Sequence, residues 1–277
     1  MAAAVEERVR FELRGGNRDL FGAREPEILV EGTAGTGKTR TILELLNALW
    51  HQYPHLRARI VRKVRDTLST TALVTFEKKV LRSDGVVFFG GSKHEPASYR
   101  YPNGSLIVVG GMDNSEKILS SEYDIVYANE ATELGIEDWE MLMGRLRNGV
   151  LPHPRIIGDC NPTHGTHWLN KRCEAGITRR LVTYLEDNPE YYDERGNLTE
   201  AGAKYLSILD RMTGTRYQRF RLGLWTGVEN AVYETFDRER QVVELEPGLM
   251  WQDSALGSDY GRVHKAGGVA LTKDQYG

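Results

Sequence analysis

The chain has 277 residues, enough for one large domain or two ordinary ones with a sizeable buried core. Its formal net charge is −3, so overall charge gives no indication of nucleic-acid binding, and any such contact must come from local patches. We expect no membrane association, because no stretch approaches the length of a membrane span and no apolar signal core opens the sequence. The two cysteines, Cys160 and Cys173, lack a metal-ligand spacing, and reduced thiols are the simplest interpretation.

After a polar lead-in over residues 1–25, a glycine-rich loop is the most informative segment. Residues 32–39 read GTAGTGKT and fit the pattern G-x-x-x-x-G-K-[ST] of phosphate-binding loops. Residues 27–31 before it are typical of a buried strand, and residues 40–50 after it carry an apolar stripe at helical spacing. This context disfavours the alternative of a glycine-rich turn that matches by chance.

The residue types of this loop explain the expected chemistry. Glycines let backbone N–H groups surround phosphate oxygens, and the N-terminus of the following helix favours an anion. We predict that ATP is bound by Gly32, Thr33, Ala34, Gly35, Thr36, Gly37, Lys38 and Thr39. Within this set, Lys38 is expected to bridge the β- and γ-phosphates, and the Thr39 hydroxyl to ligate Mg²⁺.

Strand and helix patterns then alternate along the chain. An Asn-Gly turn at residues 103–104 between apolar runs predicts a hairpin. The other predicted strands are 58–62, 85–90, 123–128, 154–160 and 180–185, and the predicted helices are 67–81 and 137–146. Such alternation indicates an α/β protein with a mainly parallel sheet covered on both faces. Its polar strand ends, at Gly32, Asn129-Glu130 and Asn161, should meet at one edge, where such sheets bind ligands.

The composition also suggests domain boundaries. We predict a core over residues 26–186, a small helical subdomain over 187–228, a connector over 229–252, and the incomplete start of another domain over 253–277.

Hydrolysis needs a group that polarises the attacking water, and Glu130 stands at the end of an apolar strand where such a carboxylate belongs. The alternative is a solvated glutamate at a helix start, where negative charge also suits the dipole. The preceding residue is Asn129, which can orient a metal-bound water but brings no charge. Asp159 or Asp124 is a possible substitute for the missing carboxylate.

Three further features have two interpretations each. Asn161 either contacts the γ-phosphate or the lytic water, or forms an ordinary Asn-Pro turn. Arg145 and Arg147, and also Lys117, are candidates for a cation that neutralises transition-state charge, although most exposed cations are simply solvated. Five cations between residues 57 and 65 either bind a phosphate backbone or form a solvated strand end.

Several segments together resemble the motor half of the tailed-phage terminase large subunit. They are the loop 32–39, Arg62-Lys63, the hairpin 102–107, the acidic segment 123–134, residues 160–168, and residues 219–237. The last of these is the most specific, because helicases and kinases lack it. Members of this family often lack the Asp before the catalytic Glu, as at Asn129.

This resemblance implies a P-loop ATPase of the additional-strand, catalytic-glutamate type with a helical lid subdomain. It implies ATP and Mg²⁺ as cofactors, and a homo-oligomeric ring on a portal protein that drives double-stranded DNA into a capsid, with a small terminase subunit choosing the start site. The expected location is the host cytoplasm, transiently on the procapsid. Asp259 is similar to the first metal-binding aspartate of an RNase H-like nuclease, whose other strands are absent from this sequence. A cationic finger, Arg145 or Arg147, would act across a subunit boundary.

Other functions remain as alternatives. A helicase-type motor should show further helicase motifs, and a small-molecule kinase would lack a carboxylate at Glu130. GTPases are disfavoured because no Asn-Lys-x-Asp motif occurs. A non-hydrolysing nucleotide-binding scaffold would bind ATP without turnover.

Overall fold

The computed structural model describes residues 12–81, 85–93, 95–112 and 121–226, and the backbone of residues 251–259 and 267–274. The chain divides into two compact units, Met1–Ala231 and Val232–Gly277. The predicted connector 229–252 lies almost entirely outside the described residues, as does Lys117. In the part that is described, no helix is both long and apolar enough to cross a membrane.

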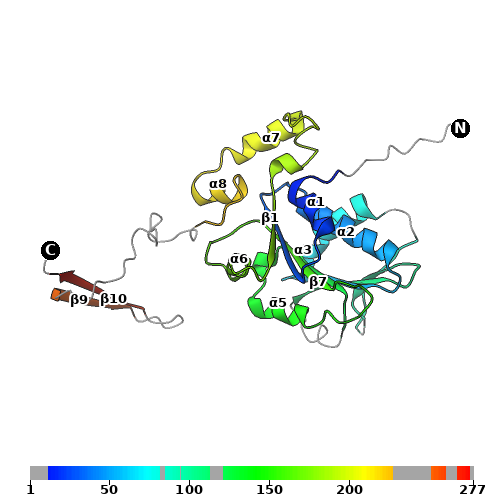
Figure 1. Cartoon of the computed structure of the whole chain (residues 1–277), viewed down its shortest axis with the longest axis horizontal. Coiled ribbons are helices and arrows are strands. Elements are labelled where there is room, and N and C mark those ends of the chain that lie inside the picture. Colours follow the sequence, from blue (N-terminus) through cyan, green and yellow to red (C-terminus); the bar gives the residue numbers. More distant parts are fainter. Residues whose placement is uncertain are drawn as a thin grey trace. The chain divides into compact units, whose positions relative to one another are not determined.

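The first unit is built on an eight-stranded sheet with the order β3-β4-β5-β2-β6-β7-β1-β8. Figure 1 labels β1 and β7 of this sheet, together with helices of the same unit. The contacts among β5, β2, β6, β7, β1 and β8 are parallel, and only β3 and β4 run antiparallel to their neighbours. The predicted α/β class with a mainly parallel sheet is therefore confirmed. The strands are β1 (Glu27–Gly32), β2 (Arg57–Arg62), β3 (Val87–Phe89), β4 (Ala97–Arg100), β5 (Leu106–Gly111), β6 (Ile125–Ala128), β7 (Arg155–Cys160) and β8 (Arg179–Thr183).

Helices cover both faces of this sheet because alternate strand residues are apolar on both sides. Ile28 and Val30 of β1 belong to one core cluster, while Leu29 between them belongs to the other. The first cluster packs against α1 (Gly15–Gly22), α2 (Lys38–Gln52), α3 (Arg65–Ser69), α4 (Ala72–Thr75) and η1 (Phe76–Val80). The second packs against η3 (Ala131–Glu133), α5 (Ile136–Met143) and α6 (Trp168–Glu174).

The helix predicted over residues 67–81 is wrong as a single element. Thr70 and Thr71 hydroxyls donate to the carbonyl of Thr67, and the backbone of Thr71 leaves the helical region at φ −123° and ψ −88°. Threonines that bond back to the preceding turn compete with continued helix. The segment consequently forms α3, α4 and the π-helical turn η1, rather than one helix.

Beyond β8, η4 (Leu185–Asp187), α7 (Glu200–Leu209) and α8 (Gly214–Phe220) form a small helical group. Its own core contains Leu185, Leu206 and Leu209. In the second unit, β9 (Trp251–Asp259) and β10 (Gly267–Asp274) form an antiparallel pair in which Asp259 lies opposite Gly267. The side chain of Asp259 lies outside what the structure describes, so its nuclease role stays a prediction.

Asp124 organises the amino-terminal edge of the sheet, the end opposite Glu130. It is fully buried, and its carboxylate accepts hydrogen bonds from the backbone N–H groups of Arg57 (2.9 Å), Val150 (2.8 Å) and Leu151 (3.0 Å), and from the Asn148 amide (2.7 Å). This position rules out the idea that Asp124 replaces the missing carboxylate of the phosphate site.

We predict that Asp124→Ala lowers the free energy of unfolding by about 3 kcal/mol, because buried donors lose their acceptor. Urea titration followed by circular dichroism measures the change. Glu122→Ala is the matched control, since Glu122 makes an exposed ion pair with Arg147 and should change stability by less than about 1 kcal/mol. Equal effects of the two substitutions would contradict this account of Asp124.

Candidate functional site

The phosphate loop forms between β1 and α2, where two glycines are needed for geometric reasons. A Cβ at Gly32 would collide with the carbonyl oxygen of Thr183 on β8. Gly37 precedes α2 in the left-handed region at φ 87° and ψ 5°, which lets the loop turn sharply into the helix. The loop thereby places the first N–H groups of α2 toward the edge where the parallel strands end.

Lys38 begins α2 with its side chain folded back into the loop. Its Nζ donates to the carbonyls of Gly32 (3.0 Å) and Thr33 (2.7 Å) and to Asn161 Oδ1 (3.1 Å). The residue is only 7% exposed, and burial lowers the pKa of its ammonium group, against the opposing charge of Asp159. A buried cation held by neutral oxygens is well suited to receive an anion.

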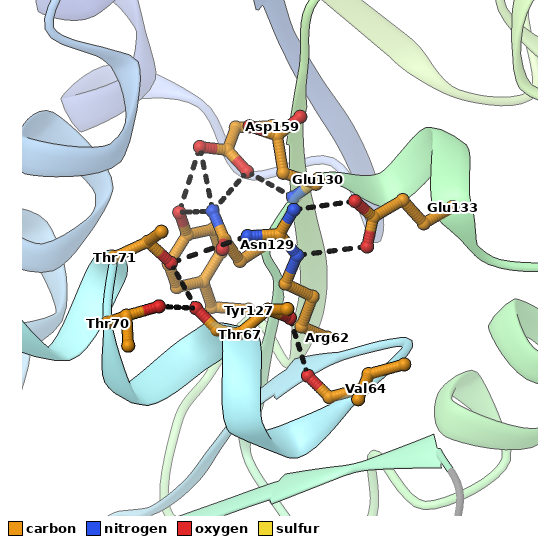
Figure 2. Close-up of polar contacts among 10 residues, drawn as sticks. All are labelled: Arg62, Val64, Thr67, Thr70, Thr71, Tyr127, Asn129, Glu130, Glu133 and Asp159. Carbon is orange, nitrogen blue, oxygen red and sulfur yellow. Dashed lines mark hydrogen bonds and ion pairs between the residues drawn. The ribbon is translucent and has the colours of Figure 1, made fainter.

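A buried carboxylate, Asp159 at the end of β7, connects the loop to β6. It accepts hydrogen bonds from the Thr39 hydroxyl (2.6 Å), the Tyr127 hydroxyl (2.9 Å), the Asn129 amide (3.1 Å) and the Glu130 backbone N–H (2.8 Å). Figure 2 shows the last three of these converging on one side chain. Asp159 thus brings a carboxylate into contact with Asn129, the position at which the sequence pattern lacks one.

The backbone of Glu130 adopts the left-handed conformation, at φ 51° and ψ 57°, which is uncommon for residues other than glycine. This conformation is energetically unfavourable for such residues, and they occur often at functional sites. Burial, followed by the nearby charge of Asp159, raises the pKa of Glu130 to about 7, although Lys38 and Arg62 oppose the effect. A carboxylate with such a pKa is suited to accept a proton near neutral pH.

A second layer of contacts supports the Glu130 segment. Arg62, at the end of β2, forms a two-point ion pair with Glu133 at 2.6 and 2.9 Å, and also donates to Thr71 at 3.4 Å. As Figure 2 shows, Thr71 continues this network into α3 through Thr67. Among the other cations between residues 57 and 65, Arg59 is buried and Lys63 pairs with Asp138, so this cluster does not form one free basic surface.

The phosphate loop and the polar strand ends face one cavity of about 950 Å³. It is lined by loop residues 34–39 and by Glu130, Asp159 and Asn161, so Lys38 and Glu130 border the same space. The loop residues Gly32 and Thr33 lie behind it, with their carbonyls turned to Lys38.

Oxygen donors in this cavity fit the metal that the loop implies. The Thr39 hydroxyl and Asp159 carboxylate are hard ligands of the kind that Mg²⁺ prefers. The side-chain amide oxygen of Asn129, Oδ1, is buried and accepts no hydrogen bond within the described residues. It can therefore accept one from a further donor such as a metal-bound water.

Arg145 and Arg147 do not reach this cavity in their own subunit. The carbonyl of Arg145 accepts from the N–H of Tyr123, which precedes β6, and Arg147 pairs with Glu122. Both therefore lie at the amino-terminal end of β6, whereas Glu130 follows its carboxyl end. Any role for either as a finger requires a neighbouring subunit.

The structure adds residues that sequence reasoning did not single out. Asn17 on α1 donates to the carbonyl of Thr36 (2.8 Å), and Asn188 donates to the carbonyl of Gly35 (2.5 Å). Tyr191 lines the cavity and stacks on Tyr205 with ring centroids 4.9 Å apart. These residues come from segments far apart in the chain and carry no local motif, so no sequence signal indicated them.

Comparison with known proteins identifies the family. A family model described as phage terminase large subunit matches residues 25–199. The PBSX phage terminase large subunit of Bacillus subtilis (strain 168) is 26% identical over 170 residues, which are 61% of this chain and 38% of that protein.

Solved structures show the same fold. The large terminase of the thermophilic bacteriophage D6E superposes with a TM-score of 0.64 at 15% identity, covering 91% of this chain and 63% of that one. The ATPase domain of the Thermus phage P74-26 large terminase gives 0.56 at 11% identity, covering 78% and 95%. The D6E protein has also been solved with ADP and with ATP-gamma-S. This chain therefore spans less than two thirds of the PBSX and D6E proteins.

The raised pKa of Glu130 has a consequence for stability. The folded protein holds this proton up to about pH 7, whereas the ordinary value is 4.5, so folding stability is lost as pH rises through that interval. We predict that Glu130→Gln, which is neutral, is more stable than wild type by about 2 kcal/mol at pH 8 and nearly equal to it at pH 5.

Thermal and urea unfolding at the two pH values measure this difference. Glu133→Gln is the matched control, because its carboxylate is paired with Arg62 and its loss should not stabilise the protein. If the Glu130→Gln variant is no more stable than wild type at pH 8, ionisation of Glu130 does not lower the folding stability, and the prediction is wrong.

Proposed function

Since the chain belongs to the phage terminase large subunit family, we propose that it is the ATP-hydrolysing motor part of such a protein and drives double-stranded DNA into a capsid. One observation carries this proposal: Lys38 and Glu130 border the same cavity, with Asp159 linking the phosphate loop to the Glu130 strand. The D6E large terminase has been solved in complex with ATP-gamma-S, which supports nucleotide binding by this chain.

ATP binding uses groups that are already positioned. Lys38 exchanges its carbonyl partners and Asn161 for the β- and γ-phosphate oxygens, while the N–H groups of the loop and of α2 surround the phosphates. Thr39 and Asp159 would hold Mg²⁺, which would neutralise phosphate charge. Asn161 then lies next to the γ-phosphate, since it contacts Lys38 before the nucleotide arrives.

Hydrolysis depends on Glu130. Its carboxylate accepts a proton from the water that attacks the γ-phosphorus, while the bond from that phosphorus to the β–γ bridging oxygen breaks and ADP leaves. The pKa of about 7 makes Glu130 a better proton acceptor than an ordinary glutamate. The ion pair of Arg62 with Glu133 and the bond from the Glu130 N–H to Asp159 keep the strand end in place.

The complete motor involves partners beyond this chain. We propose a homo-oligomeric ring seated on a portal protein, a small terminase subunit that selects the start site, and action in the host cytoplasm on the procapsid. Contact with DNA should depend on the phosphate backbone rather than on base sequence. Nuclease activity would need further carboxylates in addition to Asp259.

We predict that Lys38→Ala lowers ATP turnover by at least about 100-fold, because the phosphates lose their buried cation. A phosphate-release assay with and without duplex DNA measures the rate. Lys171→Ala serves as control, since Lys171 is exposed on α6 and pairs with Glu174. ATPase activity near wild type in the Lys38 variant would refute this assignment.

A second substitution separates a motor from a scaffold that binds ATP without turnover. We expect Glu130→Gln to retain ATP affinity within about threefold and to lose turnover by about 100-fold or more, because only the proton acceptor is removed. Fluorescent-nucleotide titration and phosphate release measure the two properties. A wild-type chain that binds ATP but shows no turnover for the substitution to remove would favour the scaffold.

A further inference from the structure

The nucleotide cavity is lined by charged side chains of both signs from several elements. The N-terminal segment and the segment after β8 contribute carboxylates and an aromatic ring: Glu12, Asp187, Glu190 and Tyr191. Three cations also line it, Arg40 on α2 and Lys78 and Lys79 on η1. These cations attract a triphosphate, and the Tyr191 ring offers a surface on which a base can stack.

The lysines of η1 lie on the Glu130 side of the phosphate loop, as the order of strands and the packing of η1 indicate. In the sheet, β6 and β2 lie on one side of β1 and β8 on the other. The turn η1 follows β2 in the chain and packs against α2, whereas α1 packs against β8. Because Glu130 follows β6, a γ-phosphate placed for attack beside Glu130 is turned toward η1.

The geometry of η1 directs both lysines outward. Its π-helical turn closes with a bond from the N–H of Leu81 to the carbonyl of Phe76 (2.8 Å). Phe76 and Val80 are buried in the core, and the carboxylate of Glu77 accepts from the Tyr99 hydroxyl. Lys78 and Lys79 are exposed, line the cavity, and form no ion pair with any other described residue. Turns of this type occur frequently at functional sites.

The phosphate loop itself supplies little positive charge. Lys38 is the only cation among residues 32–39, and of the predicted finger candidates Arg145 and Arg147 lie at the opposite edge of the sheet while Lys117 lies outside the described residues. Arg40, the third cation that lines the cavity, is paired with Glu44 at 3.3 Å. Charge that develops on the γ-phosphate oxygens in the transition state needs a further cation, and the two lysines of η1 are placed to provide it.

We propose, on the basis of the function above, that Lys78 and Lys79 bind the terminal phosphate of ATP within the same subunit. They are positioned to favour ATP over ADP and to stabilise charge on the transferred phosphoryl group. The proposal assigns the additional cation to the turn after β2, in a segment that no sequence motif marks.

The test compares the purified chain with three variants: the double variant Lys78→Ala/Lys79→Ala, the double variant Lys78→Arg/Lys79→Arg, and the control Lys171→Ala. Titration with fluorescent ATP and ADP gives the two affinities without DNA, and phosphate release gives turnover. We expect the double alanine variant to lose about tenfold in ATP affinity, to bind ADP within about twofold of wild type, and to lose turnover by about 100-fold. The double arginine variant should recover most of both losses.

Two outcomes would overturn the proposal. Unchanged ATP affinity and turnover in the double alanine variant would exclude both lysines from the phosphate site. If DNA-free binding and turnover are normal and only stimulation by DNA is lost, the lysines contact DNA instead.

Subunit mixing tests the within-subunit arrangement. Mixing the double alanine variant with Glu130→Gln should not restore turnover, because each active site needs its own lysines and its own Glu130; restoration would place the lysines in a neighbour's site. Failure of the proposed function would give a different result from failure of the lysine proposal. A wild-type chain without ATPase activity would refute the proposed motor function, whereas the ATP and ADP affinities would still decide the role of the lysines.

Discussion

The site depends on the hydrogen bonds that the buried carboxylate of Asp159 accepts. Asp159 is 2% exposed and joins three elements, because Thr39 on α2, Tyr127 on β6 and the backbone of Glu130 all donate to it. A buried charge is tolerated only when its oxygens are satisfied, so these donors and Asp159 require one another. The same charge contributes to the raised pKa of Glu130. Structure and proton affinity at the site thus have a common origin.

The helical group after β8 is attached directly to the phosphate loop. Asn188 donates to the carbonyl of Gly35, and a Cβ at Gly35 would press on the rings of Tyr191 and Tyr205. The end of the same group contacts the segment that follows β7: Arg219 donates to the carbonyl of Pro162, and Thr226 exchanges backbone bonds with Thr163 and Gly165. Since Asn161 immediately precedes Pro162 and contacts Lys38, the phosphate site and the helical group share a continuous chain of contacts.

Local patterns predicted much of the fold correctly. The loop at residues 32–39, the strands β1, β6 and β7, and the hairpin of β4 and β5 all occur where the sequence indicates them. The error at residues 67–81 is informative. The apolar spacing of a helix is present there, yet the side chains of Thr70 and Thr71 bond to the backbone and interrupt it. Hydrophobic periodicity reports which face is buried, but not whether the backbone hydrogen bonds continue.

The sequence by itself determined the phosphate loop, the alternation of strands and helices, and the polar strand ends at Glu130 and Asn161, because each rests on neighbours within a few residues. Only the tertiary structure decided that Asp159 rather than Asp124 lies beside Thr39 and Glu130, since the two carboxylates lie at opposite ends of parallel strands. It also placed Arg145 and Arg147 away from the cavity in their own subunit, and Lys78 and Lys79 beside it. The reason is physical: burial, charge proximity and the sharing of one cavity depend on the order of strands in the sheet, which spacing along the chain does not encode.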